Sequence, residues 1–142
     1  GGLTSGVAIA AKTIKPSIKV VAAEPENAKD AFLSKQADEM QDHLPGQPST
    51  IADGLKTLLG SHTWPVVRNL VDAVITVNEA EIVAHTELVW RRLKVCIEPS
   101  SAVGVAAALS DAFDEQFADC RNVGVILCGG NVDVRKIAAL FQ

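Results

Sequence analysis

Residues Gly124–Asp133 read Gly-Val-Ile-Leu-Cys-Gly-Gly-Asn-Val-Asp, and the fold predicted from this sequence depends on this stretch. Its apolar run without alternation is typical of a strand buried on both faces of a sheet. The two glycines allow a sharp turn and close approach of a ligand, and Asn131 or Asp133 can cap a closing helix from Val134 to Phe141. Cys128 would then stand at the carboxyl end of a strand, where ligands bind in open α/β sheets. A tight turn around a small buried cysteine explains the same stretch without a ligand.

Outward from this stretch, the chain alternates between strands and helices. The expected strands are Ile18–Ala23, Ala73–Val77 and Gly124–Leu127, and the expected helices are Leu3–Lys12, Ala28–Gln36, Thr63–Leu70, Glu79–Lys94, Ala102–Phe113 and Val134–Phe141. The expected N-caps of three of these helices are Asn27, Asn78 and either Ser100 or Ser101. This alternation predicts an α/β fold with a doubly wound parallel sheet and helices on both faces.

Length and composition limit the classes of function. The chain has 142 residues, which is enough for one domain with a core, and a net charge of -4 without a basic cluster, so a nucleic-acid polymer is not the expected partner. No apolar run approaches the roughly 20 residues of a membrane span. Three cysteines without metal-ligand spacing favour a reduced, cytoplasmic protein. The start on Gly1-Gly2, without a methionine, suggests a piece of a longer protein.

Three places combine residues that can bind a ligand. Gly1 and Gly2 precede a helix, so backbone N–H groups at its positive end can bind an anion such as phosphate. Glu24 and Asp30 flank one turn, where two carboxylates and a free carbonyl can hold Mg²⁺ or Ca²⁺, although acids also favour helix N-termini without any metal. Glu98 is either an acid at a helix entry or a buried functional carboxylate.

The histidines do not form a cluster in the sequence. His43, His62 and His85 lie in loop or helix positions far apart along the chain. We interpret all three as surface residues and not as metal ligands or catalytic bases.

Five short motifs occur in order along the chain. They are Gly1-Gly2-Leu3-x-x-Gly6, Ala23-Glu24-Pro25, Thr50-Ile51-Ala52-Asp53-Gly54, Ile97-Glu98-Pro99 and Gly129-Gly130-Asn131-Val132-Asp133. Each motif is weak alone, but the ordered set is specific. Together they resemble the C-terminal half of the serine racemase and serine/threonine dehydratase family, whose members are fold-type II pyridoxal-phosphate (PLP) enzymes.

The resemblance implies a set of cofactor-binding residues. Gly1, Gly2 and Leu3 resemble the end of the glycine-rich loop whose amides bind the PLP phosphate. Gly54 matches a backbone position beside the cofactor, and Glu98 matches a carboxylate in the same pocket. Cys128 matches a Ser or Cys that hydrogen-bonds the pyridine nitrogen, and a neutral thiol is a weak partner for that nitrogen. Serine is common there in the racemases and cysteine in some serine dehydratases, so the balance between the two activities stays open.

The resemblance also implies a cation and a nucleotide. Glu24, the Ala28 carbonyl and Asp30 match the family's site for Mg²⁺, Ca²⁺ or Mn²⁺. Lys94 and Asn131 resemble positions that contact a regulatory ATP in animal serine racemases. Enzymes of this family are usually homodimers.

The implied activity needs residues that this chain does not carry. None of its eight lysines lies in the family's Schiff-base motif, which belongs to the N-terminal half. The resemblance therefore implies that residues 1–142 are the C-terminal portion of the PLP-binding large domain, without its N-terminal portion and small domain. The implied reactions are interconversion of L- and D-serine and loss of water from serine to give pyruvate and ammonia. A threonine or 3-hydroxyaspartate ammonia-lyase of the same family, and a non-catalytic fragment serving as a binding or scaffold domain, are the alternatives.

Overall fold

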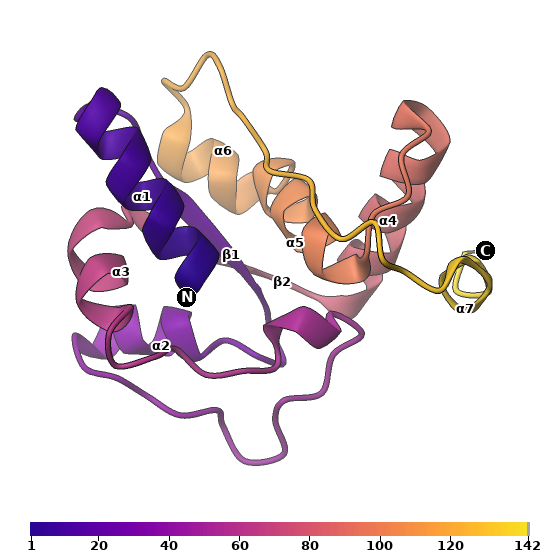
Figure 1. Ribbon diagram of the computed structural model, residues 1–142, viewed down its shortest axis with the longest axis horizontal. Helices are drawn as coiled ribbons and strands as arrows, with labels where there is room; N and C mark the ends of the chain where they lie inside the picture. Colours follow the sequence, from indigo (N-terminus) through magenta and orange to yellow (C-terminus); the bar gives the residue numbers. More distant parts are fainter. Residues whose placement is uncertain (142) are drawn as a thin grey trace.

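A computed structural model describes residues 1–141 as helices packed around a small parallel sheet (Figure 1). In chain order the elements are α1 (Gly2–Ile14), β1 (Val21–Pro25), α2 (Asp30–Ala37), the 3₁₀ helix η1 (Asp53–Leu55), α3 (Trp64–Leu70), β2 (Ala73–Val77), α4 (Glu79–Leu93), α5 (Pro99–Ala108), α6 (Asp111–Phe117) and α7 (Val134–Ala138). No helix within this range is long and apolar enough to cross a membrane.

The sheet pairs β1 with β2 in parallel, from Val21 opposite Ala73 to Pro25 opposite Val77. Because side chains alternate along a strand, each strand contributes to both faces of the sheet. In the part of the chain that the structure describes, these are the two strands of the sheet, so β1 keeps one edge without a partner strand.

Two apolar cores lie on opposite faces of the sheet (Figure 1). One core joins Ile75 and Val77 of β2 to α4 and α5, and the other joins Val74 to α1 and α3. The predicted α/β class with helices on both faces of a parallel sheet is therefore confirmed, for a sheet of two strands where three were expected.

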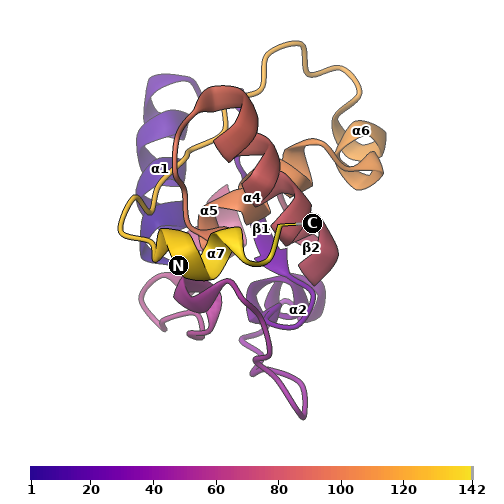
Figure 2. The same ribbon diagram turned by 90° about the vertical axis from the view of Figure 1, so that its right-hand side faces the viewer.

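The expected third strand is wrong for this structure. Residues 121–133 form neither strand nor helix, and Ile126 is 52% exposed. A strand needs a neighbouring backbone to bond its N–H and C=O groups, and no other strand pairs with this segment within residues 1–141. The segment instead runs from α6 back toward α1 before it reaches α7 (Figure 2). Cys128, expected at a buried strand end, is consequently exposed.

Local signals placed several helix ends correctly. Asn78 caps α4 in a capping box with Glu81, and Asp133 caps α7 through the N–H groups of Arg135 and Lys136. Helix α7 ends at Ala138, earlier than predicted.

Other helix boundaries differ from the prediction. The expected helix Ala102–Phe113 is divided, because Ser110 caps a separate helix α6 by accepting the N–H of Phe113. Helix α2 begins at Asp30 with Lys29 as its N-cap, so the expected cap at Asn27 is wrong. The carboxylate of Glu24 takes over the capping role from the end of β1, by accepting the N–H groups of Ala31 and Phe32.

Candidate functional site

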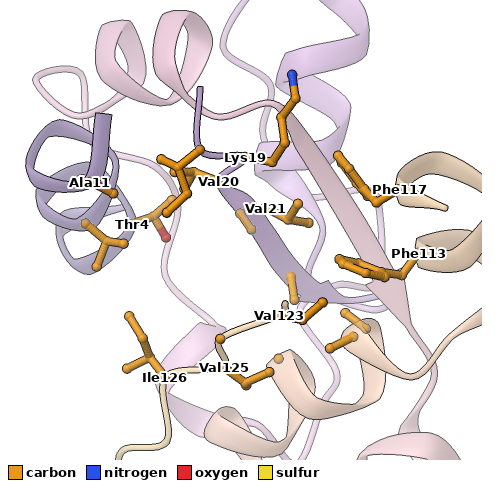
Figure 3. A pocket seen from close by; sticks show the side chains of 18 of the residues that line it. Thr4, Ala11, Lys19, Val20, Val21, Phe113, Phe117, Val123, Val125 and Ile126 are labelled. Carbon is orange, nitrogen blue, oxygen red and sulfur yellow. The ribbon is translucent and has the colours of Figure 1, made fainter. Parts of the chain in front are cut away.

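A cavity of about 720 Å³ lies along the free edge of β1. Figure 3 shows Val21 of β1, Phe113 and Phe117 of α6, and Val123 and Val125 of the following segment around it. This part of the wall is apolar, so the cavity can take up apolar groups as well as a ligand.

One part of the same cavity is lined by residues that can bind a polar ligand. Leu3 and Thr4 come from the first turn of α1, and Ser100 and Cys128 come from two other segments. Helix α1 has Gly1 as its N-cap and no side chain that bonds its first N–H groups, so these groups can bind an anion. A Cβ atom at Gly1 would lie 2.8 Å from Leu59 Cδ2, so the backbone there approaches its neighbours closely.

Two serines of α5 hold the loops that surround this region. The Ser100 hydroxyl accepts the Gly54 N–H at 3.0 Å, and the Ser101 hydroxyl accepts the Cys128 N–H at 2.9 Å. Neither serine is the helix cap that we expected, because Glu98 is the N-cap of α5. Their hydroxyls instead connect the start of α5 to two loops that are distant in sequence.

Glu98 and Gly129 fit against each other. Gly129 has φ of +84°, and a Cβ there would lie 2.1 Å from Glu98 Cγ, so a side chain at this position is excluded by backbone conformation and by space. A Cβ at Gly54 would lie 3.8 Å from Glu98 Oε1. The Glu98 side chain therefore lies between two loops whose glycines leave room for it.

A smaller cavity of about 160 Å³ adjoins Glu98. Gly54, Glu98 and Asn131 line it together, so the structure brings these three predicted site residues to one place. Lys94 is not among the lining residues. It lies exposed at the end of α4 with φ of +59°, and the contact of Lys94 and Asn131 with a nucleotide stays a prediction.

The end of β1 holds a half-buried carboxylate. Glu24 accepts the N–H groups of Ala31 at 3.1 Å and Phe32 at 2.8 Å. Burial, together with the neighbouring charge of Asp30, raises the pKa of Glu24 to about 7, and the two backbone hydrogen bonds oppose this rise. A carboxylate whose charge is disfavoured in this way would be stabilised by a cation.

Asp30 is buried, and only one of its two carboxylate oxygens accepts a hydrogen bond. Its Oδ2 accepts the Leu59 N–H at 2.7 Å, whereas its Oδ1 faces Nδ1 of His43 at 3.9 Å. The His43 side chain is 9% exposed, so the prediction that all three histidines are surface residues is wrong for His43. The loop of residues 38–50 bonds to α2 through the Gln41 N–H and the Ser34 hydroxyl, and it places His43 against Asp30 and Lys56, a contact that local sequence did not reveal.

The same turn offers a backbone ligand. Within residues 1–141 the Ala28 carbonyl accepts no backbone hydrogen bond, so its oxygen is free to bind a cation. No group of three or more His, Cys, Asp or Glu side chains in this range is arranged to hold a metal ion by itself. A cation at this turn would therefore need the carbonyl and water in addition to the side chains, as Mg²⁺ and Ca²⁺ usually do.

Comparisons with known proteins place these features in a family context. The family described as "Pyridoxal-phosphate dependent enzyme" matches residues 1–129. Serine racemase of Arabidopsis thaliana is 53% identical over 144 aligned residues, which cover all of this chain and 43% of that protein. Serine racemase of Rattus norvegicus is 49% identical over the whole chain and 42% of its own length.

A solved structure shares the fold over nearly the whole chain. The structure of maize serine racemase superposes with a TM-score of 0.91 at 50% identity, covering 98% of this chain and 42% of that one. The chain thus spans about two fifths of the length of the proteins that it matches.

Proposed function

The chain belongs to the pyridoxal-phosphate-dependent enzyme family, and we propose that it is the C-terminal portion of the large domain of a serine racemase or serine dehydratase. The complete enzyme would interconvert L- and D-serine, eliminate water from serine to give pyruvate and ammonia, or do both. The observation that carries this proposal is the convergence of the open N-terminus of α1, Ser100 and Cys128 on one cavity.

The remaining three fifths of the enzyme would complete the sheet and the active site. The free edge of β1 and the apolar wall formed by Val123 and Val125 support this part of the proposal, because further strands could pair and pack there. The N-terminal portion of the large domain and the small domain would also supply the Schiff-base lysine. In this arrangement residues 124–127 would form the strand that the sequence predicts, within a larger doubly wound sheet.

The chemistry of residues around two cavities supports binding of PLP: Leu3, Ser100 and Cys128 line the larger cavity, and Gly54 and Glu98 line the smaller one. The N–H groups of Gly2 and Leu3 would bind the phosphate of PLP at the positive end of α1. Gly54, held by Ser100, and Glu98 would border the ring, and the Cys128 thiol would donate a weak hydrogen bond to the ring nitrogen. When bound, PLP supplies an electron-withdrawing ring that makes the α-carbon proton of an amino acid acidic.

Residues of this chain would orient the cofactor without moving the substrate proton. Glu98 and Ser100 would fix the position of the ring edge, and the Ser101 hydroxyl would hold the backbone of Cys128. The weak Cys128 hydrogen bond would leave the ring nitrogen mostly unprotonated, which favours loss of a β-hydroxyl. The proton donors and acceptors would come from the N-terminal portion.

The turn after β1 is the second part of the proposed site. Glu24, the Ala28 carbonyl and Asp30 would bind Mg²⁺, Ca²⁺ or Mn²⁺ with water as the remaining ligands. The raised pKa of Glu24 and the unused Oδ1 of Asp30 support a cation there. Its role would be to fix the turn between β1 and α2.

The proposal extends to regulation, assembly and location of the complete enzyme. Lys94 and Asn131 would contact a regulatory ATP, and two copies of the enzyme would form a homodimer. A cytoplasmic location is supported by Cys96, Cys120 and Cys128, none of which forms a disulfide within the described residues.

An ammonia-lyase acting on threonine or 3-hydroxyaspartate is the second candidate. Its support is a solved threonine deaminase structure, which superposes with a TM-score of 0.82 at 36% identity over 94% of this chain and 47% of that one. A non-catalytic fragment acting as a scaffold is the third candidate.

Product analysis separates these candidates. The full-length protein, loaded with PLP, would be incubated separately with L-serine, L-threonine and 3-hydroxyaspartate, and D-serine, pyruvate, 2-oxobutyrate and oxaloacetate would be measured. We expect D-serine or pyruvate from L-serine as the main product. Turnover that is faster with threonine or 3-hydroxyaspartate would favour the ammonia-lyase, and PLP binding without turnover of any substrate would favour the scaffold.

A further inference from the structure

We propose that His43 supplies a nitrogen ligand to a divalent cation at Asp30, so that this site prefers Mn²⁺ and similar transition-metal ions to Mg²⁺ and Ca²⁺. This inference rests on the proposed cation site and adds to it a residue from the loop of residues 38–50. It is carried by the position, burial and hydrogen bonding of one imidazole ring.

The ring of His43 is oriented by a backbone contact. Its Nε2 lies 3.1 Å from the carbonyl oxygen of Lys56, and a carbonyl only accepts hydrogen bonds, so Nε2 carries the proton. In a neutral imidazole the other nitrogen, Nδ1, then has a free lone pair. Metal-binding histidines commonly show this arrangement, in which the distal N–H donates to a backbone carbonyl and fixes the ring.

The free lone pair is buried without a hydrogen-bond partner. The side chain of His43 is 9% exposed, and its Nδ1 is a buried atom that forms no hydrogen bond with the described residues. An unpaired polar atom of this kind is costly unless something else binds it.

Nδ1 faces a second electron-rich atom. Asp30 Oδ1 lies 3.9 Å away on a side chain that is 3% exposed, and Oδ2 of the same carboxylate is already used by the Leu59 N–H. Two ligands that each lie about 2.1 Å from one ion are at most about 4.2 Å apart, so an ion fits between these atoms after a small side-chain adjustment. Because the pair is only two side chains, the Ala28 carbonyl and water would complete the coordination.

A nitrogen ligand changes which ions the site prefers. Mg²⁺ and Ca²⁺ favour oxygen ligands, whereas imidazole suits first-row transition-metal ions such as Zn²⁺, Fe²⁺ and Ni²⁺. Mn²⁺ also takes oxygen ligands and stands at the weak end of that series, but an imidazole ligand adds more to its affinity than to that of Mg²⁺. With His43 in place, Mn²⁺ should therefore bind more tightly than Mg²⁺, and this difference should depend on the imidazole. A simple ion pair between a protonated His43 and Asp30 would produce no such preference.

The experiment is electron spin-echo envelope modulation spectroscopy of Mn²⁺ bound to the full-length protein, with Mn²⁺ alone as the probe. Directly bound imidazole gives a ¹⁴N modulation, which changes predictably when the histidines are labelled with ¹⁵N. We expect this modulation in the wild type and in the control H85Q, because His85 lies on α4 and bonds the Glu81 carbonyl. In H43Q the modulation should disappear, and Mn²⁺ affinity should fall about tenfold or more with a smaller change for Mg²⁺.

The possible results separate this inference from the proposed function. Bound Mn²⁺ with oxygen ligands only in the wild type would overturn the role of His43, and so would an unchanged ¹⁴N modulation in H43Q. If D30N loses Mn²⁺ while the wild type shows no nitrogen ligand, the cation site stands and His43 is not part of it. Absence of any Mn²⁺ binding would overturn both the nitrogen ligand and the cation site. The PLP absorbance of the same samples measures cofactor binding separately, so the proposed function can stand or fall independently. The wild-type spectrum decides the matter even if H43Q does not fold.

Discussion

Two apolar runs with nearly the same pattern have different structures in this molecule. Residues 20–23 run into Glu24 and Pro25, and β1 forms from Val21 to Pro25, whereas residues 123–127 run into Cys128 and Gly129 and form no strand. The first run has β2 beside it, and the second lies across a cavity from the unpaired edge of β1. The difference shows that an apolar run gives a segment the capacity to be a strand, and that a neighbouring strand decides whether it becomes one.

The turns that follow the two runs also differ in the hydrogen bonds that hold them. At the end of β1, Glu24 accepts two backbone N–H groups of α2, and Asp30 accepts the N–H of Leu59 from a loop 29 positions further along, so this turn is held by contacts that lie within the chain. After residues 123–127, the Cys128 N–H bonds to Ser101, and the Cys128 side chain is exposed. We infer that the turn between Glu24 and Asp30, where we propose a cation, is formed by this chain alone. The segment around Cys128, where we propose the cofactor, would take its final form only with the rest of the enzyme.

The largest expected effect comes from truncating Ile126 in the second run, with Ile82 as the reference for a side chain that is already buried in this structure. Ile82 of α4 is fully buried in the core that α4 and α5 form with the sheet, so I82A in the full-length protein should lower the free energy of unfolding by about 2–5 kcal/mol. Ile126 is 52% exposed in this structure. If other strands cover it in the complete enzyme, I126A should lower the free energy of unfolding nearly as much as I82A. Chemical denaturation of both variants measures the two values.

A third isoleucine provides the control. Ile14 ends α1 and is 85% exposed, so I14A should change stability by no more than about 0.5 kcal/mol. A value for I126A as small as that of I14A would contradict our proposal that residues 124–127 become a buried strand.

The next effect is a pH dependence that originates at the β1 turn. The pKa of Glu24 is raised from 4.5 in the unfolded chain to about 7 in the folded one, so the folded state retains a proton that the unfolded state releases. Stability from this group is therefore complete below pH 4.5 and is lost as the pH rises through 7, by an amount on the order of 3 kcal/mol. Cation-free full-length protein should show this loss in denaturation curves between pH 5 and 7.5.

The matched variant for this effect is E24Q, which has nearly the same shape and cannot ionise. The E24Q variant should lack this pH dependence of stability. In the wild type, added Mg²⁺ or Mn²⁺ should reverse the loss of stability at higher pH, because a cation favours the charged carboxylate. Identical slopes for E24Q and wild type would mean that Glu24 is not the group responsible.

A smaller effect of opposite sign is expected at the other end of β1. Burial opposes ionisation of Asp72, but hydrogen bonds from Lys12, the Val20 N–H and Lys19 outweigh it and lower its pKa from 3.8 to about 2. Stability from Asp72 is thus present above pH 3.8 and is lost as the pH falls through 2. Its size is on the order of 1 kcal/mol, because solvent screens the partly exposed lysine charges. D72N should be less stable than wild type at pH 7 and nearly equal to it near pH 2.

Asp119 serves as the control for that comparison, since it is exposed and the structure gives it no ion pair within residues 1–141. D119N should follow the wild type at every pH. An equal loss of stability in D72N and D119N would assign the effect to net charge and not to the contacts of Asp72.

Sequence alone was sufficient for some local contacts, such as the cap of α4, but not for all of them, because the cap of α6 at Ser110 was missed. The capping box of Asn78 and Glu81 spans three residues, and the α/β class follows from the order of the apolar runs. It was insufficient where the contact joins distant segments, because the bond from Gly54 to Ser100 crosses 46 positions and leaves no periodic signal. The burial of His43 could not be predicted for the same reason, because it depends on contacts of a loop residue with Asp30 and Lys56, which are distant in the sequence.

The third strand was a different kind of error. Its residues have the right apolar pattern, but the pattern contains no information about whether a partner strand is present. For the same reason the sequence could identify Cys128 as a candidate site residue without determining its exposure.

The most direct test of the central claim, that this chain forms the cofactor edge of a serine-converting PLP enzyme, is the product ratio of Cys128 variants. C128S in the full-length enzyme keeps a neutral donor, so it should retain PLP absorbance and most of the activity. C128D places a negative charge against the ring nitrogen and holds it protonated, so the pyruvate-to-D-serine ratio formed from L-serine should fall and the absorbance spectrum with serine should change. A C128D enzyme whose ratio and spectrum match the wild type would contradict the account, because Cys128 would then not face the cofactor.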